Sequence, residues 1–207
     1  MKDIDKFIEW ATELQSLSQT AIFYCKDKFD KERFQRIREI SAEMIAMKTG
    51  LPLDKVKDLF CGDEGYQTPK IDTRAAIFKD DKVLLVRESD GRWTLPGGWC
   101  EFNLTPAENV VKEVKEEAGL DVTVDKLVAV HDRERHNADT YIFGVAKFFF
   151  LCSELGGEFT ANIETIESKY FAEDELPTSM ANEKCTAAQI KLCFKAYRAD
   201  FWETQFD

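Results

Sequence analysis

The sequence lacks the features that would place it in a membrane or outside the cell. No apolar run among its 207 residues approaches the roughly 20 residues of a transmembrane helix. Residues 1–5 show no signal-peptide pattern, and no internal repeat or low-complexity segment follows. The six cysteines have none of the paired spacings of a zinc site. We therefore expect reduced thiols in a cytoplasmic protein without a membrane partner.

An excess of positive charge is also missing. The net charge is −11, of which residues 1–70 contribute −1 and the remainder −10. Proteins that hold nucleic acid through a broad surface do so with clustered Lys and Arg. The composition therefore argues against that class. An acidic second part suits a metal site, although acidity alone also serves solubility.

The first third of the chain has the pattern of helices. Apolar residues recur at helical spacing over residues 3–25 and about 30–49, and a short helix is predicted over 53–60. Two long amphipathic helices need a partner for their apolar faces. The stretch Cys61–Lys70, which contains Gly and Pro, reads as a linker. We predict a helical N-terminal domain over residues 1–66, which mediates dimerisation and completes the substrate pocket.

The remainder, residues 67–207, alternates strands with two helices, which predicts an α+β domain. Lys79–Lys82 is expected to turn a hairpin, Gly156-Gly157 is expected to form a turn, and a helix is predicted at Ala187–Trp202. The expected strands are Ile71–Phe78, Val83–Arg87, Arg92–Leu95, Val122–Asp132, Tyr141–Glu154 and one containing Tyr170-Phe171.

The most informative segment is a predicted helix that starts after Thr105. Thr105 can cap the helix, Pro106 fits the first helical position, and Glu108 completes a capping box. Gly119 ends the helix, because glycine readily adopts positive φ. Immediately upstream lies the loop Leu95–Gly98. The helix is therefore expected to begin and end within narrow limits, close to a glycine loop.

Three glutamates share one side of this helix. At 100° per residue, Glu113, Glu116 and Glu117 occupy one arc between the solvated side and an apolar stripe. Such carboxylates repel one another unless a cation neutralises them, and Mg²⁺ and Mn²⁺ prefer oxygen ligands. Lys112 can pair with Glu116 one turn on. The apolar stripe consists of Ala107, Val110, Val111, Val114 and Ala118.

These residues resemble the Nudix hydrolase family, whose box reads G-x5-E-x7-R-E-U-x-E-E-x-G-U with U aliphatic. The chain departs from the box at Leu104, where the family has Glu, and at Lys112, where it has Arg. Lysine keeps the charge but not the planar fork of arginine. The matching positions are Gly98, Glu113, Val114, Glu116, Glu117, Gly119 and Leu120.

The resemblance implies an α/β/α sandwich around a mixed sheet. The helical N-terminal region, the run Trp93–Trp99 and the ending Thr204–Asp207 look like a Gram-positive subgroup that includes CDP-choline pyrophosphatases and chains labelled ADP-ribose pyrophosphatases. In that subgroup Leu or Tyr at position 104 is usual. The implied reaction is divalent-metal-dependent hydrolysis of a nucleoside diphosphate linked to a group X, which yields a nucleoside monophosphate and phospho-X. The implied assembly is a homodimer.

The resemblance also implies roles for individual residues. Glu113, Glu116 and Glu117 are expected to bind Mg²⁺ or Mn²⁺, with the Gly98 carbonyl as a further ligand. In many relatives the general base comes from a later loop, where Glu164 and Glu167 are available and Glu167 is preferred; alternatively a box glutamate serves as base. The cationic residues expected to contact phosphate or sugar are Arg74, Arg87, Arg133 and His136.

Two further functions stay open at this stage. The chain could process RNA ends by decapping or exonuclease action, or it could be a nucleotide-sensing regulator on a Nudix fold. The acidic surface counts against the first, and the retained glutamates count against the second. Beside the glycine loop, Trp99 and Phe102 could stack on a base, but packing in the core is the commoner role of such residues.

Overall fold

The computed structural model describes residues 6–137, 141 and 143–207. It divides into two compact units, which we call the helical unit and the sheet unit. The helical unit comprises Met1–Pro69 with Thr140–Phe143, and the sheet unit comprises Lys70–Asp139 with Gly144–Asp207. The predicted domain boundary after residue 66 falls in a segment without helix or strand. None of the described helices is long and apolar enough to cross a membrane.

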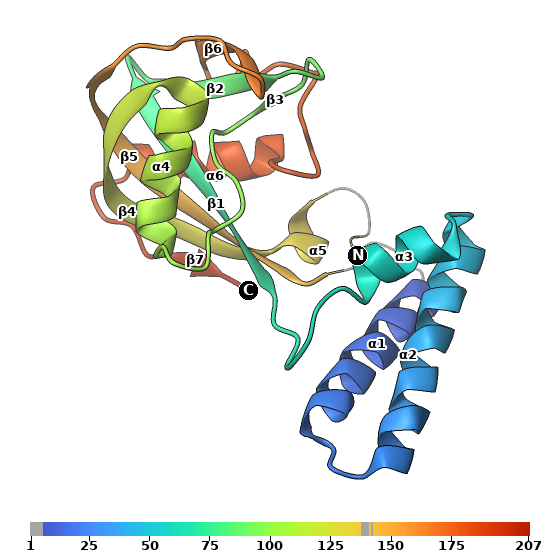
Figure 1. The fold of residues 1–207 in the computed structure, drawn as a ribbon. Coiled ribbons are helices and arrows are strands. Elements are labelled where there is room, and N and C mark those ends of the chain that lie inside the picture. Colours follow the sequence, from blue (N-terminus) through green and yellow to red (C-terminus); the bar gives the residue numbers. More distant parts are fainter. Residues whose placement is uncertain (1–5, 138–140, 142) are drawn as a thin grey trace. The chain divides into compact units, whose positions relative to one another are not determined.

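The helical unit contains three helices (Figure 1), and both ends of α2 carry clear capping signals. Asp27 caps α2 by accepting hydrogen bonds from two backbone N–H groups at its start, and Gly50 ends it with a φ of 71°. These features confirm the expected helices, within the described residues. Their bounds are α1 Lys6–Tyr24, α2 Lys28–Thr49 and α3 Leu53–Phe60.

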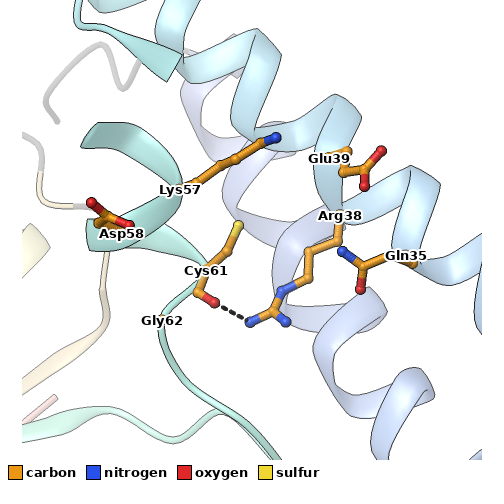
Figure 2. A pocket seen from close by; sticks show the side chains of 7 residues that line it. All are labelled: Gln35, Arg38, Glu39, Lys57, Asp58, Cys61 and Gly62. Carbon is orange, nitrogen blue, oxygen red and sulfur yellow. Dashed lines mark hydrogen bonds between the residues drawn. The ribbon is translucent and has the colours of Figure 1, made fainter. Parts of the chain in front are cut away.

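A small apolar core and a polar network hold the helical unit together. Arg38 of α2 donates to the backbone carbonyls of Cys61, at 2.8 Å, and Asp63, at 2.6 Å, and so fixes the chain that leaves α3. Figure 2 shows the bond to Cys61 beside a cavity lined by residues of α2, α3 and the segment that follows α3. The apolar core comprises Ala11, Ala42, Ile45, Val56 and Phe60.

The sheet unit is built on one mixed sheet in the order β3-β2-β1-β5-β4-β7, and β6 also pairs with β2. The pairs β1·β5 and β4·β7 are parallel, and the others are antiparallel. The hairpin between β1 and β2 turns at Asp80 and Asp81, both at positive φ, as a tight turn requires. The strands are β1 Lys70–Lys79, β2 Lys82–Glu88, β3 Trp93–Thr94, β4 Leu120–Asp132, β5 Val145–Gly157, β6 Thr165–Phe171 and β7 Gln205–Phe206.

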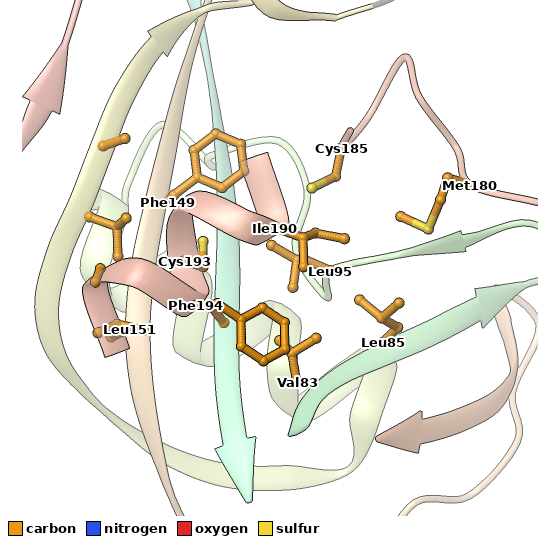
Figure 3. Packing of buried hydrophobic residues seen from close by; sticks show 14 of the residues in the cluster. Val83, Leu85, Leu95, Phe149, Leu151, Met180, Cys185, Ile190, Cys193 and Phe194 are labelled. Atoms are coloured by element: carbon orange, nitrogen blue, oxygen red, sulfur yellow. The ribbon is translucent and has the colours of Figure 1, made fainter. Parts of the chain in front are cut away.

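A helix covers each face of the sheet (Figure 1). On one face, α4 (Pro106–Ala118) packs through its apolar stripe. On the other, α6 (Ala187–Arg198) buries Ile190, Cys193 and Phe194 against the sheet (Figure 3). The short helix α5 (Arg133–His136) follows β4. This layering confirms the expected α/β/α sandwich.

Most boundaries lie within two residues of the sequence prediction, and larger differences occur at Gly156-Gly157, at the C-terminal helix and at the start of β5. Gly156 and Gly157 do not form a turn but extend β5, where a Cβ on Gly157 would lie 2.4 Å from the Gly119 carbonyl oxygen. The C-terminal helix stops at Arg198, and Trp202 instead donates its indole N–H to the Val128 carbonyl of β4. The strand predicted from Tyr141 begins at Val145, and residues 140 and 142 lie outside the described part of the chain.

Candidate active site

Helix α4 presents the glutamates because its ends and its buried face are set by the sequence. Thr105 and Glu108 form the expected capping box, Pro106 begins the helix, and Gly119 ends it at a φ of 71°. These contacts confirm the predicted helix. Its residues Val110, Val114 and Ala118 are fully buried against the sheet. The side that carries the glutamates is thereby turned toward the glycine loop.

The Leu95–Gly98 loop is held against β1 by backbone hydrogen bonds. Ala75 donates its N–H to the Pro96 carbonyl at 2.9 Å, and Thr73 donates to the Gly98 carbonyl at 2.8 Å. Gly97 has a φ of 140°, and a Cβ there would lie 1.9 Å from the Thr73 carbonyl oxygen. Only glycine fits this approach. The Gly98 carbonyl, predicted as a metal ligand, accepts hydrogen bonds from the Thr73 N–H and, at 3.5 Å, from the Thr73 hydroxyl.

Glu117 is buried under this loop. Its side chain accepts a hydrogen bond from the Gly97 N–H at 2.8 Å, and the residue is 7% exposed. Burial raises the pKa of Glu117 to about 7, although the positive charge of Arg74 and the Gly97 N–H oppose the rise. The charges of Glu113 and Glu88 raise this pKa further. The site thus places an ionisable carboxyl where ionisation is costly without a cation.

Glu113 faces the next residue of the loop. A Cβ on Gly98 would lie 2.6 Å from Glu113 Oε2, so glycine leaves the space that this carboxylate occupies. Burial raises the pKa of Glu113, the positive charge of Lys112 opposes the rise, and the negative charge of Glu116 adds to it. Two of the three glutamates predicted as metal ligands therefore meet the glycine loop directly.

Glu116 points toward solvent and is held by Lys112. The Lys112 Nζ lies 2.6 Å from Glu116 Oε2, which confirms the predicted pair, and 3.2 Å from Glu101 Oε1. Among residues 6–137, 141 and 143–207, no three Asp, Glu, His or Cys side chains converge as a metal site. Lys112 binds the Glu116 carboxylate and the Gly97 N–H binds the Glu117 carboxylate, so these two carboxylates face different partners. The donors are nonetheless all oxygens, the set that Mg²⁺ and Mn²⁺ prefer.

The start of β6 and the loop before it are tied to the C-terminal end of α4. Asn162 donates to the Glu116 carbonyl, and Thr165 donates its hydroxyl to the Glu117 carbonyl, both at 2.8 Å. Asn162 also accepts a hydrogen bond from the Glu164 N–H. These bonds hold the backbone of Glu164 beside the glutamate helix. Glu167 lies further along β6, where its carboxylate is 3.4 Å from Arg87 Nη1.

The four predicted substrate contacts occupy different places. Arg74 is buried and paired with Asp72, whereas Arg87 is partly exposed and faces Glu167 on the neighbouring strand. Arg133 and His136 lie together on α5. The Arg133 guanidinium is buried beside Glu134, and His136 Nε2 lies 2.8 Å from an oxygen of Asp207. The fold therefore does not gather all four at the glycine loop.

Sequence reasoning missed two carboxylates near the site. Glu88 ends β2 and is paired with Lys184, and its negative charge contributes to the raised pKa of Glu117. Glu101 follows the glycine loop and shares Lys112 with Glu116. Neither belongs to a helical pattern that would have marked it. The expected core packing of Trp99 and Phe102 is wrong, because Trp99 is 48% exposed and Phe102 is fully exposed.

Comparison with known families and relatives covers both units. Residues 69–189 match the model of the NUDIX domain, and residues 5–60 match a model described as a UDP-X-like, N-terminal oligomerisation domain. The protein YjhB of Bacillus subtilis (strain 168), provisionally named an ADP-ribose pyrophosphatase, is 38% identical over 203 residues, which cover 98% of this chain and 97% of the relative.

Two solved structures extend the comparison. An ADP-ribose pyrophosphatase from Streptococcus suis 89-1591 is 53% identical with a TM-score of 0.63, and the match covers 68% of this chain and all of the other. A UDP-X diphosphatase is 32% identical with a TM-score of 0.64, and the match covers 97% of this chain and 98% of the other. The family match, the relatives and the glutamate helix agree, and the chain belongs to the Nudix hydrolase family as a Nudix pyrophosphohydrolase.

Proposed function

We propose that this enzyme hydrolyses the pyrophosphate bond of a nucleoside diphosphate linked to a group X, with Mg²⁺ or Mn²⁺ as cofactor. ADP-ribose is the first candidate substrate, because YjhB and the Streptococcus suis structure both carry that name. The UDP-X diphosphatase supports UDP-linked compounds as a second candidate. CDP-choline is the third, from the subgroup resemblance. The products would be a nucleoside monophosphate and phospho-X.

One observation carries this proposal: the glycine loop faces the buried Glu117 and the partly buried Glu113. Gly97 donates its N–H to Glu117, and Gly98 leaves the space filled by Glu113. A bound divalent cation would supply charge neutralisation for the pyrophosphate and a more acidic bound water. Glu113, Glu116, Glu117 and the Gly98 carbonyl would hold it. Arg87, Arg133 and His136 remain candidates for contact with the phosphates or the sugar.

A substrate panel in ¹⁸O-labelled water would test the proposed activity. The panel contains ADP-ribose, UDP-glucose, CDP-choline, nucleoside triphosphates and a short RNA, each with Mg²⁺, Mn²⁺ or EDTA. Metal-dependent release of a nucleoside monophosphate and phospho-X supports the proposal, and the position of the label locates the attacked phosphorus. Turnover of RNA alone would favour end processing instead. Lack of turnover despite proven metal binding would favour a sensing role.

We infer that Glu164, and not the Glu167 preferred from the sequence, is the general base. Its backbone is tied to α4 through Asn162, and no ion pair of its carboxylate occurs within the described residues, whereas Glu167 faces Arg87. We expect Glu164→Gln to lower kcat by about 10²- to 10⁴-fold and to remove the acidic limb of the pH–rate profile. Glu167→Gln, the matched control, removes a partly exposed ion pair and should lower kcat less than about fivefold. The reverse ranking would assign the base to Glu167, and no effect of either would assign it to a box glutamate.

The helical unit is proposed to make the enzyme a homodimer. Trp10, Leu17 and Tyr24 lie at heptad spacing on α1 and are 57%, 61% and 64% exposed. The matching family model describes an oligomerisation domain. Multi-angle light scattering at micromolar concentration should give a dimer for the wild type and a monomer for Leu17→Lys. Glu32→Gln, which changes charge on α2, should remain dimeric, and a monomeric wild type would contradict the proposal.

A further inference from the structure

Three charged side chains are buried together on the face of the sheet that α6 covers. Asp72, Arg74 and Lys147 are 4%, 3% and 2% exposed. Asp72 and Arg74 are two residues apart on β1 and share a face, and Lys147 is the register partner of Asp72 on β5. Asp72 accepts from Lys147 Nζ at 2.6 Å and from Arg74 Nε and Nη2 at 2.9 and 2.6 Å. We call these three residues the buried charge cluster.

Burying these three charges costs desolvation free energy that the pairing of β1 with β5 does not require. The cluster holds two cations and one carboxylate, so one positive charge is left over in a site that water hardly reaches. Desolvation of buried ions costs several kcal/mol each, and apolar residues of similar size often serve stability as well. Stability therefore does not explain why both cations are present. A second contact of Arg74 offers an explanation.

Arg74 joins the cluster to the glycine loop. While Nε and Nη2 bind Asp72, Nη1 donates to the Leu95 carbonyl at 3.2 Å. Leu95 begins the loop, which continues to Gly97, whose N–H binds Glu117, and to Gly98 beside Glu113. Lys147 makes no comparable contact with the loop among the bonds that the described residues show. The planar guanidinium can serve Asp72 and Leu95 at once because its donors point in fixed, different directions.

We propose that Arg74 is a positioning residue that fixes the Leu95–Gly98 loop against Glu113 and Glu117, with Asp72 holding its guanidinium in place. In this role it replaces the substrate contact that the sequence suggested for Arg74. The inference rests on the proposed metal-dependent function of these glutamates. It makes Arg74 act on metal binding and on turnover rather than on recognition of the substrate.

Two variants with the same charge change separate this role from a general effect of charge. Arg74→Met and Lys147→Met each remove one buried cation, and each leaves Asp72 with one cationic partner, so both are expected to fold. Only Arg74→Met also loses the bond to Leu95. Mn²⁺ binding without substrate, followed by electron paramagnetic resonance of the free ion, should weaken about 10- to 100-fold in Arg74→Met. In Lys147→Met it should weaken less than about threefold.

Steady-state kinetics provides the second readout. With ADP-ribose at saturating Mn²⁺, Arg74→Met should lower kcat about tenfold or more and leave KM within about threefold. Thermal melting checks that both variants fold. If Arg74→Met is unstable, Arg74→Lys replaces it, because lysine keeps the charge but cannot bind Asp72 through two nitrogens and Leu95 as well.

Several outcomes would overturn the inference. A rise in KM without loss of Mn²⁺ affinity would make Arg74 a substrate contact. Equal effects of Arg74→Met and Lys147→Met would assign the effect to net charge. Wild-type Mn²⁺ affinity in both Arg74 variants would show that the loop keeps its position without Arg74. A wild-type protein without metal-dependent turnover would instead refute the proposed function, so the two failures are distinguishable.

Discussion

Glu117→Gln and Glu113→Gln are each expected to lower metal-dependent turnover by about a thousandfold, or about 4 kcal/mol of transition-state stabilisation. Glutamine keeps the size of the side chain, and its carbonyl oxygen can still accept the Gly97 hydrogen bond that Glu117 accepts. It lacks the negative charge that a divalent cation needs. The loss would therefore reflect metal binding rather than a collapsed helix.

Glu108→Gln is the matched control on the same helix. Glu108 belongs to the capping box at the start of α4, and glutamine serves in that position as well. We expect its turnover to stay within about threefold of wild type, because a conservative change at a cap costs little stability. The measurement is initial velocity against Mn²⁺ concentration for all three variants. Full activity of either Glu113→Gln or Glu117→Gln would remove that residue from the metal site.

The same Glu117→Gln variant is expected to be more stable than wild type when metal is absent and the pH is high. The folded-state pKa of Glu117 is about 7, against an ordinary value of 4.5. Between these values the folded state retains a proton that the unfolded state has lost. Stability therefore falls as the pH rises through this window, by about 3 kcal/mol in total. Glutamine carries no ionisable group, so the free energy of unfolding of the variant does not fall with pH for this reason.

Denaturation with urea in EDTA should show the difference. At pH 8 the free energy of unfolding of Glu117→Gln should exceed that of wild type by about 3 kcal/mol, and at pH 4 the two should agree within about 0.5 kcal/mol. Adding Mn²⁺ at pH 8 should stabilise the wild type and not the variant, because a ligand stabilises the state that binds it. A variant equal to or less stable than wild type at pH 8 would contradict a costly buried carboxylate.

The helix that carries the site could be predicted because its signals are local. The cap at Thr105, the stop at Gly119 and the pair between Lys112 and Glu116 all join residues within one or two turns. The β1–β2 hairpin was predictable for the same reason. The match to the Nudix box then assigned the family and the fold, because the glycine and glutamate positions are spaced along a single segment.

The roles of Arg74 and Glu88 could not be predicted, because Arg74 also binds Leu95 and Glu88 binds Lys184, and both of these partners are distant in the sequence. Arg74 lies on a strand, where a charge suggested contact with a ligand, yet Asp72 and Lys147 enclose it only after β1 and β5 pair. Glu88 meets Lys184 across almost one hundred residues. Long-range pairing of this kind depends on the register of the strands, which local patterns do not contain.

The sequence alone determined the glutamate helix, its caps, the glycine loop and the alternation of helices and strands, since each depends on neighbours a few residues away. The tertiary structure decided which carboxylates are buried, and hence why the pKa of Glu117 rises. It also decided which carboxylates the Arg and Lys side chains pair with, and it placed the Gly97 N–H against Glu117. Burial and charge pairing depend on which surfaces meet, and those surfaces meet only when the sheet, α4 and α6 have packed together.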